Sequence, residues 1–434
     1  MQRKGRRCGE VKNSMPAIRT GTEKPVLASV IAFVRHVACR RVTFWRLKRL
    51  GQEKAMIPKT IVTCTLMLLL GQLLFAQEKL PTIKATSKLV DIRDGDNFQK
   101  GSWTISPELK PDTYTTSSVG KKVIFYTDKD SISIKITPTT KFHFIILLND
   151  TTRALTEIKY LPSYLDILKT ADNYDFNDNR PIPVFTYQSE NDSNLLALRK
   201  GFKLDSIAGE GNEVSKILNL MHWVHNLIPH DGNHENPAVK NALSMIAECK
   251  KGNRGLNCRG LATVLNECYL SLGIPSRFVT CMPKDSVFND CHVINMVYSR
   301  NLKKWLWIDP TNDAYVMNGK GELLSIEEVR SSVIHNKPII LNPEANWNHK
   351  VSKTKEEYLY QYMAKNLYRM ECPVESKYDY ETWINGKTVS YVELLSLNAY
   401  KQLPQKTTGT NAKTGTTFIH YKTNNPNLFW TLPE

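Results

Sequence analysis

Alternating apolar and polar positions mark the first patterned part of the chain, between residues 82 and 165. Three short runs there, bounded by Asp, Lys and Pro residues, have the composition of β-strands with one buried face. They are Val123–Tyr126, Ile132–Ile136 and Phe142–Leu148. We therefore predict a small antiparallel sheet or sandwich, and no cluster of residues in it indicates chemistry.

The spacing of apolar residues becomes helical further along the chain. From Glu213 to Leu227 they recur with the period of one helix face. A second apolar stripe follows Cys258 and stops at Gly273, with Pro275 two residues beyond, which is a standard helix end. The sequence thus predicts one helix in each of these segments.

Strand-like runs follow the second helix, at Arg277–Met282, His292–Tyr298 and Trp305–Ile308. Beyond them the pattern predicts a helix near Glu356–Tyr368 and a strand at Thr417–Tyr421. This mixture of helices and hairpin-like strands, placed after a β-rich region, predicts an α+β fold.

A segment rich in Asn, Asp, Pro and Ser separates the two kinds of pattern, at residues 173–194. Such a composition is typical of a loop between domains. We expect a β-rich accessory domain at 82–172, a second domain at 195–345 and a C-terminal α/β extension at 346–434, to which the sequence assigns no role.

The formal net charge of +16 would suit a nucleic acid or an anionic membrane as partner, but its distribution argues against this. Residues 1–55 hold 14 Lys and Arg against 3 Asp and Glu. From Gln77 onward the chain has 43 basic and 39 acidic residues, which is an ordinary balance for a protein surface. We therefore expect no nucleic-acid partner for the folded part.

An uncharged apolar stretch from Thr60 to Ala76 follows Met56 and Lys59, and Gln77 comes after it. A short positive start, an apolar middle and a small final residue are the layout of a signal peptide. The run is shorter than the roughly 20 residues of a membrane-spanning helix, which favours a signal peptide over the alternative of a retained membrane anchor. We expect a basic leader at 1–55 outside the mature protein, a signal peptide at 56–76, a periplasmic or secreted location, and no stable membrane insertion after cleavage.

Six cysteines follow the expected cleavage point: Cys249, Cys258, Cys268, Cys281, Cys291 and Cys372. Six cysteines between Gln77 and Glu434 are too sparse for a disulfide scaffold. The absence of a C-x-x-C pair argues against a thiolate zinc site. Cys268 lies on the second helix, and Cys291 should point to the sheet face opposite its neighbour His292. Both are expected to be packing residues.

Cys258 differs from the others because Asn257 precedes it at the start of the second helix. Asn is among the best helix N-cap residues, so Cys258 should lie in the first turn. There the positive end of the helix dipole and unpaired backbone N–H groups lower a thiol pKa, and the same groups bind a developing oxyanion. Position as well as residue type therefore favours Cys258 as a nucleophile.

His292 and Asp309 are brought together by a predicted hairpin. If Arg300 and Asn301 form a two-residue turn, cross-strand partners have residue numbers that sum to 601, and His292 lies opposite Asp309. Directly opposed residues have Cβ atoms about 4.5–5.5 Å apart, within reach of a carboxylate–imidazole hydrogen bond. A one-residue slip would separate the two side chains, so the argument depends on the register.

Four stretches together resemble the core of the transglutaminase-like family, which is similar to papain-like thiol proteases in topology and mechanism. They are Gly255–Cys258, Leu272–Arg277, Asp290–His292 and Lys304–Thr311. The resemblance covers roughly residues 205–330. It implies a helix carrying Cys258 packed on an antiparallel sheet that carries His292 and Asp309, and it makes the domain at 195–345 the catalytic one.

The same resemblance implies a Cys258–His292–Asp309 triad that performs acyl transfer through a thioester, with no metal or organic cofactor. Family members commonly have an acidic residue after the Cys and a small residue followed by Trp after the His. Here Arg259 and Val293–Ile294 occupy these positions. We interpret these departures as differences in cleft and substrate.

A competing signal is a group of histidines within thirteen residues, His222, His225, His230 and His234. Such a group could hold zinc, but Pro229 and the Asp231–Asn233 turn interrupt any helix there, and no H-E-x-x-H motif is present. We favour a helix end followed by an exposed loop that borders the cleft.

The sequence therefore predicts an exported cysteine peptidase or amidase that acts on a peptide or protein of unknown identity. Two alternatives stay open. One is a non-catalytic binding module on the same fold, and the other is a protein-glutamine γ-glutamyltransferase that cross-links proteins.

Overall fold

The computed structural model describes residues 80–285, 290–399 and 404–433. The expected basic leader and signal peptide lie outside these residues. The described chain divides into two compact units, with the break between Tyr160 and Leu161. Each unit is described by itself below.

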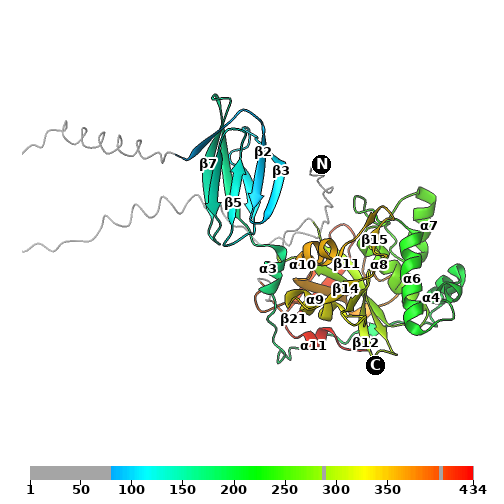
Figure 1. The fold of residues 1–434 in the computed structure, drawn as a ribbon. Helices are drawn as coiled ribbons and strands as arrows, with labels where there is room; N and C mark the ends of the chain where they lie inside the picture. The colour runs from blue at the N-terminus through cyan, green and yellow to red at the C-terminus, as the bar shows by residue number, and fades with distance from the viewer. Residues whose placement is uncertain (1–79, 286–289, 400–403, 434) are drawn as a thin grey trace, which may run out of the picture. The chain divides into compact units, whose positions relative to one another are not determined.

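The first unit is a β-sandwich of two four-stranded sheets, with strand orders β1-β7-β8-β4 and β3-β2-β5-β6. Its strands are blue to green in Figure 1. They are β1 (Thr82–Ala85), β2 (Leu89–Asp94), β3 (Asn97–Thr104), β4 (Asp112–Thr116), β5 (Lys122–Tyr126), β6 (Ser131–Lys135), β7 (Lys141–Leu148) and β8 (Thr152–Tyr160). The β-rich character predicted from the alternating pattern is confirmed.

Residues from both sheets share one core, which is what joins them into a sandwich. Val123 and Phe125 of β5 alternate inward, and the ring centroid of Phe125 lies 5.4 Å from that of Phe144 on the other sheet. This unit buries apolar residues by the period of two that the sequence showed.

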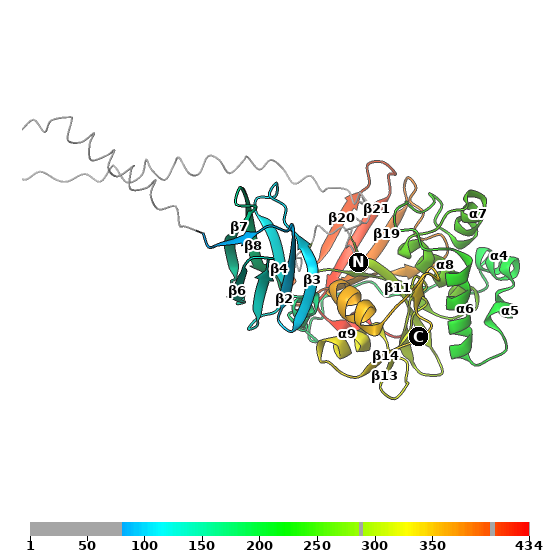
Figure 2. The ribbon, with the colours of Figure 1, turned by 45° about the horizontal axis from the view of Figure 1, so that its top comes forward.

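The second unit contains a seven-stranded sheet in the order β12-β11-β10-β17-β19-β21-β20. All neighbouring pairs are antiparallel except β19 and β21. Figure 2 shows β19, β20 and β21 side by side, in orange to red. The strands are β10 (Ser276–Met282), β11 (His292–Ser299), β12 (Lys304–Ile308), β17 (Arg369–Pro373), β19 (Thr388–Leu394), β20 (Lys406–Thr410) and β21 (Thr417–Thr423).

Five helices pack against one face of the sheet through a core that includes Val297, Leu306 and Ile308. They are α4 (Ser193–Phe202), α5 (Leu204–Ala208), α6 (Glu213–Leu227), α7 (Ala242–Gly252) and α8 (Cys258–Ser271). Both helices predicted from the apolar spacing are present, and α8 is buried along nearly its whole length.

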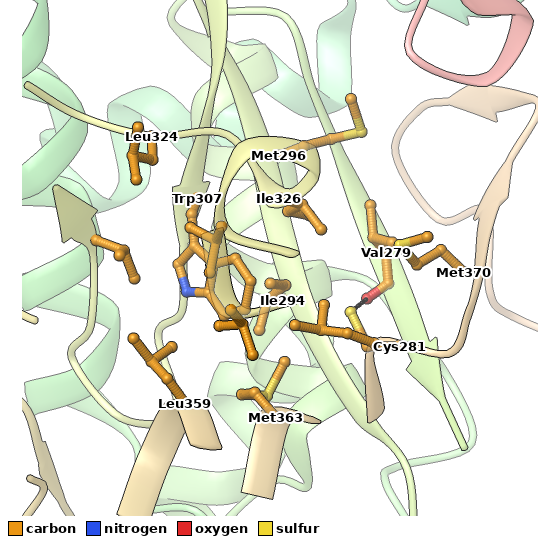
Figure 3. Close-up of a cluster of buried hydrophobic side chains, with 14 of the residues drawn as sticks. Val279, Cys281, Ile294, Met296, Trp307, Leu324, Ile326, Leu359, Met363 and Met370 are labelled. Carbon is orange, nitrogen blue, oxygen red and sulfur yellow. Dashed lines mark hydrogen bonds between the residues drawn. The ribbon is translucent and has the colours of Figure 1, made fainter. Parts of the chain in front are cut away.

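The other face of the sheet packs on segments from later in the chain. Figure 3 shows Leu359 and Met363 of the π-helical segment η2 (Glu356–Met363) facing Trp307 and Ile294 of the sheet. This side also holds α9 (Ile326–Ile334) and α10 (Ala364–Asn366), with α3 (Tyr164–Lys169) and α11 (Pro426–Phe429) at its margins. Minor strand pairs are β9 (Thr186–Tyr187) with β18 (Glu375–Ser376), β13 (Val316–Asn318) with β14 (Ile339–Leu341), and β15 (Asn346–Trp347) with β16 (Val351–Ser352).

Two expectations about domain limits differ from this arrangement. The accessory domain was expected to extend to residue 172, but α3 buries Leu168 in the core of the second unit. The segment 346–434 was expected to be an extension, but it supplies four of the seven strands of the central sheet. Pairing between strands far apart in the chain is decided by tertiary contacts, which sequence periodicity does not report.

Candidate active site

Cys258 is the first residue of α8, and Asn257 is its N-cap, as the sequence predicted. The Asn257 Oδ1 accepts a hydrogen bond from Gly260 N at 3.2 Å. Asn236 holds the cap in place, since its Nδ2 donates to Asn257 Oδ1 at 2.7 Å and its Oδ1 accepts from Asn257 N at 3.0 Å. The half-buried thiol of Cys258 therefore lies in a first helical turn whose geometry is fixed from two segments.

The hairpin that carries His292 has a different register from the predicted one. Met296 pairs with Trp307 and Tyr298 with Trp305, so partner numbers sum to 603 instead of 601. The loop is four residues long, 300–303, and Lys303 has a positive φ of 53°. Glu213 of α6 accepts hydrogen bonds from the backbone N–H groups of Arg300 and Asn301, which stabilises this wider loop.

The pairing of His292 with Asp309 survives because a shift of two residues keeps every side chain on its predicted face. Asp309 lies one residue beyond β12, diagonally across from His292, and its backbone pairs with Ala314. The Nε2 of His292 lies 2.7 Å from Asp309 Oδ2. The remaining ring nitrogen, Nδ1, is thus left for the sulfur.

Asp309 is fully buried and accepts more hydrogen bonds than the one from His292. Tyr358 OH donates to its Oδ2 at 2.6 Å and Asn312 Nδ2 at 3.0 Å, while Thr311 N donates to Oδ1 at 2.9 Å. Burial alone would raise the pKa of Asp309, but the positive charge of His292 and these donors lower it to about 2. The carboxylate is therefore ionised throughout the physiological range.

His292 is buried, and the ring of Tyr362 packs edge-on against it with centroids 5.3 Å apart. Burial opposes a charge on the imidazole, but the Asp309 carboxylate and the Cys258 sulfur outweigh it and raise the pKa of His292 to about 10. Burial likewise opposes a thiolate at Cys258, but hydrogen bonds from His230 and His292 lower its pKa to about 6. Near neutral pH the pair is a thiolate and an imidazolium.

Sequence reasoning missed three side chains of this site: Tyr358, Tyr362 and His230. The tyrosines belong to η2, about fifty residues beyond Asp309, in a segment for which the sequence indicated only a helix. The spacing Tyr358–Tyr362 places both on one face of that helix, which is the one signal that was present. His230 belongs to the histidine group that the sequence places at a helix end and in a loop bordering the cleft, with zinc binding as the competing interpretation and no role in acyl transfer.

The four clustered histidines have separate partners. His222 pairs with Asp313 at 2.6 Å, His225 contacts Pro310 O at 3.0 Å, His230 accepts from Trp347 and His234 pairs with Asp231. Within residues 80–285, 290–399 and 404–433, no group of three or more His, Cys, Asp or Glu side chains is arranged to hold a metal.

The remaining cysteines are free thiols in the described part of the chain. Cys268 is fully buried on α8, which confirms its packing role. Cys291 was also expected to be a packing residue, but its side chain is only partly buried. Desolvation of its thiol and the nearby charge of Cys258 raise the pKa of Cys291 to about 12. It therefore stays protonated beside the ionised Cys258.

Arg259, the residue that departs from the usual acidic one, does not pair with the sulfur. Its Nη1 donates to the buried Glu381 at 3.2 Å and its Nη2 to Thr280 Oγ1 at 2.8 Å. Glu381 also accepts from Tyr391 OH at 2.6 Å. The cation is thus neutralised by Glu381, a residue of the C-terminal segment.

No helix among the described residues combines the length and the apolar character that crossing a bilayer requires. This finding leaves aside residues 56–76, where the signal peptide is predicted.

Comparison with known proteins places this site in a family context. Residues 201–310, which include Cys258, His292 and Asp309, match the family model described as the transglutaminase-like superfamily. No curated protein matches the chain.

Several solved structures share parts of the fold. A candidate cysteine protease from Cytophaga hutchinsonii is 19% identical, with a TM-score of 0.21, over 34% of this chain and 45% of that protein. Red sea bream transglutaminase is 13% identical, with a TM-score of 0.19, over 54% of this chain and 50% of that one. A third structure, a transglutaminase (TGase), is 14% identical, with a TM-score of 0.19, over 57% of this chain and 77% of that one. The chain thus spans about half the length of the first two.

The family match covers about a quarter of the chain and contains the helix-start cysteine and the strand that carries the histidine. Over this segment, residues 201–310, the chain matches the transglutaminase-like superfamily.

Proposed function

We propose that this protein is a cysteine hydrolase that cleaves an amide or peptide bond through a thioester intermediate, with Cys258 as nucleophile, His292 as acid and base, and Asp309 as the residue that orients His292. One observation carries the proposal. A thiol whose pKa is lowered to about 6 lies at a helix start beside an imidazole that is hydrogen-bonded, at 2.7 Å, to a buried carboxylate.

The reaction begins with attack of the Cys258 thiolate on the carbonyl carbon of the substrate, which forms a C–S bond and moves the carbonyl π electrons onto oxygen. Collapse of this tetrahedral intermediate re-forms the carbonyl and breaks the C–N bond. The leaving amine takes the proton from the His292 imidazolium. Water, deprotonated by His292, then attacks the thioester carbonyl carbon; the C–S bond breaks, which releases the acid and returns the Cys258 thiolate beside the His292 imidazolium.

Asp309 has two roles in this scheme. Its hydrogen bond to Nε2 fixes the imidazole so that Nδ1 exchanges protons with sulfur and leaving group. Its charge also stabilises the imidazolium, which in turn stabilises the thiolate. The backbone N–H of Cys258, in the first helical turn, has no intrahelical acceptor and is available to the oxyanion.

Replacement of the nucleophile tests the proposal. Cys258→Ala should reduce turnover of a true substrate by at least about 10⁴-fold, because nothing else in the site forms the thioester. Before a substrate is known, iodoacetamide serves as the probe. Alkylation of Cys258, mapped by mass spectrometry, should reach half its maximal rate near pH 6.

Cys268→Ala is the matched control, since this thiol lies on the same helix but is fully buried and has a pKa raised by burial. It should leave the alkylation profile unchanged. Wild-type turnover in Cys258→Ala, or a Cys258 thiol that reacts only at strongly alkaline pH, would refute the proposal. Incorporation of a labelled amine into glutamine peptides in preference to hydrolysis would assign cross-linking instead.

We also propose that the protein is exported, on the basis of the apolar stretch 60–76 and the small residue Ala76 that ends it. Sequencing of the mature N-terminus from expressing cells should find Gln77 first. A mature chain that retains residues 56–76 would contradict cleavage and favour an anchor.

A further inference from the structure

A second imidazole reaches the catalytic sulfur from a different part of the chain. His230 lies between α6 and α7, and its backbone forms a parallel bridge with Leu256, two residues before Cys258. Asp231 N donates to Leu256 O at 2.7 Å, and Leu256 N donates to Pro229 O at 3.2 Å. This pairing brings the side chain of His230 near the Cys258 thiol, whose pKa it helps to lower through a hydrogen bond.

Gly255 permits this close approach of the two segments. A Cβ at position 255 would clash with the carbonyl oxygen of Pro229 and with the side chain of Asp231. No larger residue fits there without moving His230 away from the helix start. The glycine three residues before the nucleophile therefore positions the second imidazole.

The orientation of the His230 ring is set by residues near β15. Trp347 Nε1 donates to His230 Nδ1 at 3.0 Å. Asn348 holds the backbone of the same residue, since its Oδ1 accepts from His230 N at 2.7 Å and its Nδ2 donates to His230 O at 2.9 Å. Both ring and main chain of His230 are thus fixed from one segment.

An indole N–H is only ever a donor, so Nδ1 of His230 must accept, and the ring proton must reside on Nε2. A protonated ring would carry hydrogens on both nitrogens and lose the bond from Trp347. The neighbouring carboxylate, Asp231, is paired with His234 at 2.6 Å. The tautomer that suits this contact is therefore a donor through Nε2–H, the ring nitrogen that Trp347 does not hold.

We propose that His230 is a second oxyanion donor of the acyl-transfer reaction, beside the backbone N–H of Cys258: its ring is held through Nδ1 by Trp347, and its Nε2–H binds the carbonyl oxygen of the substrate as the Cys258 thiolate attacks. This inference rests on the function proposed above. The carbonyl oxygen lies one bond from the carbon that the sulfur attacks, so a donor in contact with sulfur needs only a small shift to reach it. When the C–S bond forms, the negative charge passes from sulfur to the carbonyl oxygen, and the hydrogen bond donated by His230 Nε2–H shifts from the sulfur to that oxygen.

The same geometry makes His230 unsuited to be the base. Its Nδ1 lone pair is engaged by Trp347, and its Nε2 already carries a proton. Removal of a single oxyanion donor typically lowers the rate of the chemical step by about 10²–10³-fold and changes substrate binding little. That is the effect expected of His230→Ala on acylation.

Two reagents separate stabilisation of the oxyanion from activation of the thiol. p-Nitrophenyl acetate acylates Cys258 through a tetrahedral oxyanion, whereas iodoacetamide alkylates the same sulfur without one. Rates are compared at a pH where the alkylation rate of each variant has reached its plateau. His230→Ala should acylate about 10²–10³-fold more slowly than wild type but alkylate within about threefold of it. His230→Gln, which keeps an N–H donor, should restore acylation to within about tenfold of wild type.

His234→Ala is the control, since this exposed histidine lies four residues away and pairs with Asp231. It should change neither rate. Equal losses of acylation and alkylation in His230→Ala, or no loss of acylation in either His230 variant, would overturn the assignment while leaving the Cys258 mechanism intact. A wild-type Cys258 that alkylates below neutral pH but is not acylated would overturn both proposals.

Discussion

The two imidazoles at Cys258 differ in what holds the nitrogen that faces away from the sulfur. His292 is backed by the Asp309 carboxylate at 2.7 Å, and its pKa is raised to about 10. His230 is backed by the indole N–H of Trp347 at 3.0 Å. A carboxylate favours the cation, whereas an N–H donor favours the neutral ring with its proton on the opposite nitrogen.

This contrast teaches that a histidine's role is assigned by its partner and not by its distance from the nucleophile. One ring can carry and return a proton, and the other can only donate a hydrogen bond. The site thereby combines an acid–base group and a hydrogen-bond donor from the same residue type. Replacing the residues that hold each imidazole should weaken these two roles by different amounts.

The largest effect is expected from Asp309→Asn. The amide is isosteric but uncharged, and its NH₂ group competes with the donors Tyr358 and Asn312. Without the carboxylate the pKa of His292 falls, so the imidazolium stabilises the thiolate less and the pKa of Cys258 rises. We expect turnover on the order of 10³-fold lower and an alkylation profile displaced to a pH above the wild-type midpoint of about 6.

Asp313→Asn provides the comparison for that variant, since Asp313 lies in the same loop but pairs with His222. Its alkylation midpoint should stay at the wild-type value. An Asp309→Asn midpoint that stays at the wild-type value would show that the carboxylate does not set the charge of His292.

A smaller effect is expected from Tyr358→Phe. The hydroxyl donates to Asp309 at 2.6 Å and accepts from Trp307 Nε1 at 3.3 Å, and both groups are buried. Its loss should cost about 1–3 kcal/mol of unfolding free energy and about tenfold in turnover, because Asp309 becomes less stable as an anion. Chemical denaturation measures the loss of stability, a turnover assay measures the loss of rate, and the alkylation midpoint shows whether the thiol titration has shifted.

Tyr380→Phe is the matched control, because this buried hydroxyl also makes two hydrogen bonds, both to the backbone of Ser390. It should lose similar stability with no change in the thiol titration. A Tyr358→Phe profile indistinguishable from that of Tyr380→Phe would limit Tyr358 to a structural role.

The smallest effect is expected from Trp347→Phe, which keeps the ring but removes the donor to His230. The freed Nδ1 can then take up a proton, and the proton on Nε2 is no longer obligatory. Acylation by p-nitrophenyl acetate should fall about threefold at neutral pH, with an additional pH dependence absent from the wild type.

Trp223→Phe serves as its control, since Trp223 packs on Phe202 among the helices of the second unit. Wild-type acylation at every pH in Trp347→Phe would mean that the indole does not fix the tautomer of His230.

Local features of the sequence predicted a good part of this structure. The N-cap Asn257 placed Cys258 in a first helical turn, because capping depends on only a few adjacent residues. Apolar spacing located α6 and α8, and alternation assigned His292 and Asp309 to faces that proved compatible. The hairpin register was wrong by two residues, because Glu213, far away in the sequence, stabilises a longer loop.

By itself, the sequence determined which side chains have the chemistry: a thiol at a helix start, an imidazole entering a strand and a carboxylate leaving one. Only the tertiary structure decided their protonation states and the residues around them. The partners Tyr358, Trp347 and His230 come from segments before Cys258 or after Asp309 in the chain. Propensity and periodicity act over a few residues, whereas the charge of a buried group depends on everything that packs around it, wherever it lies in the chain.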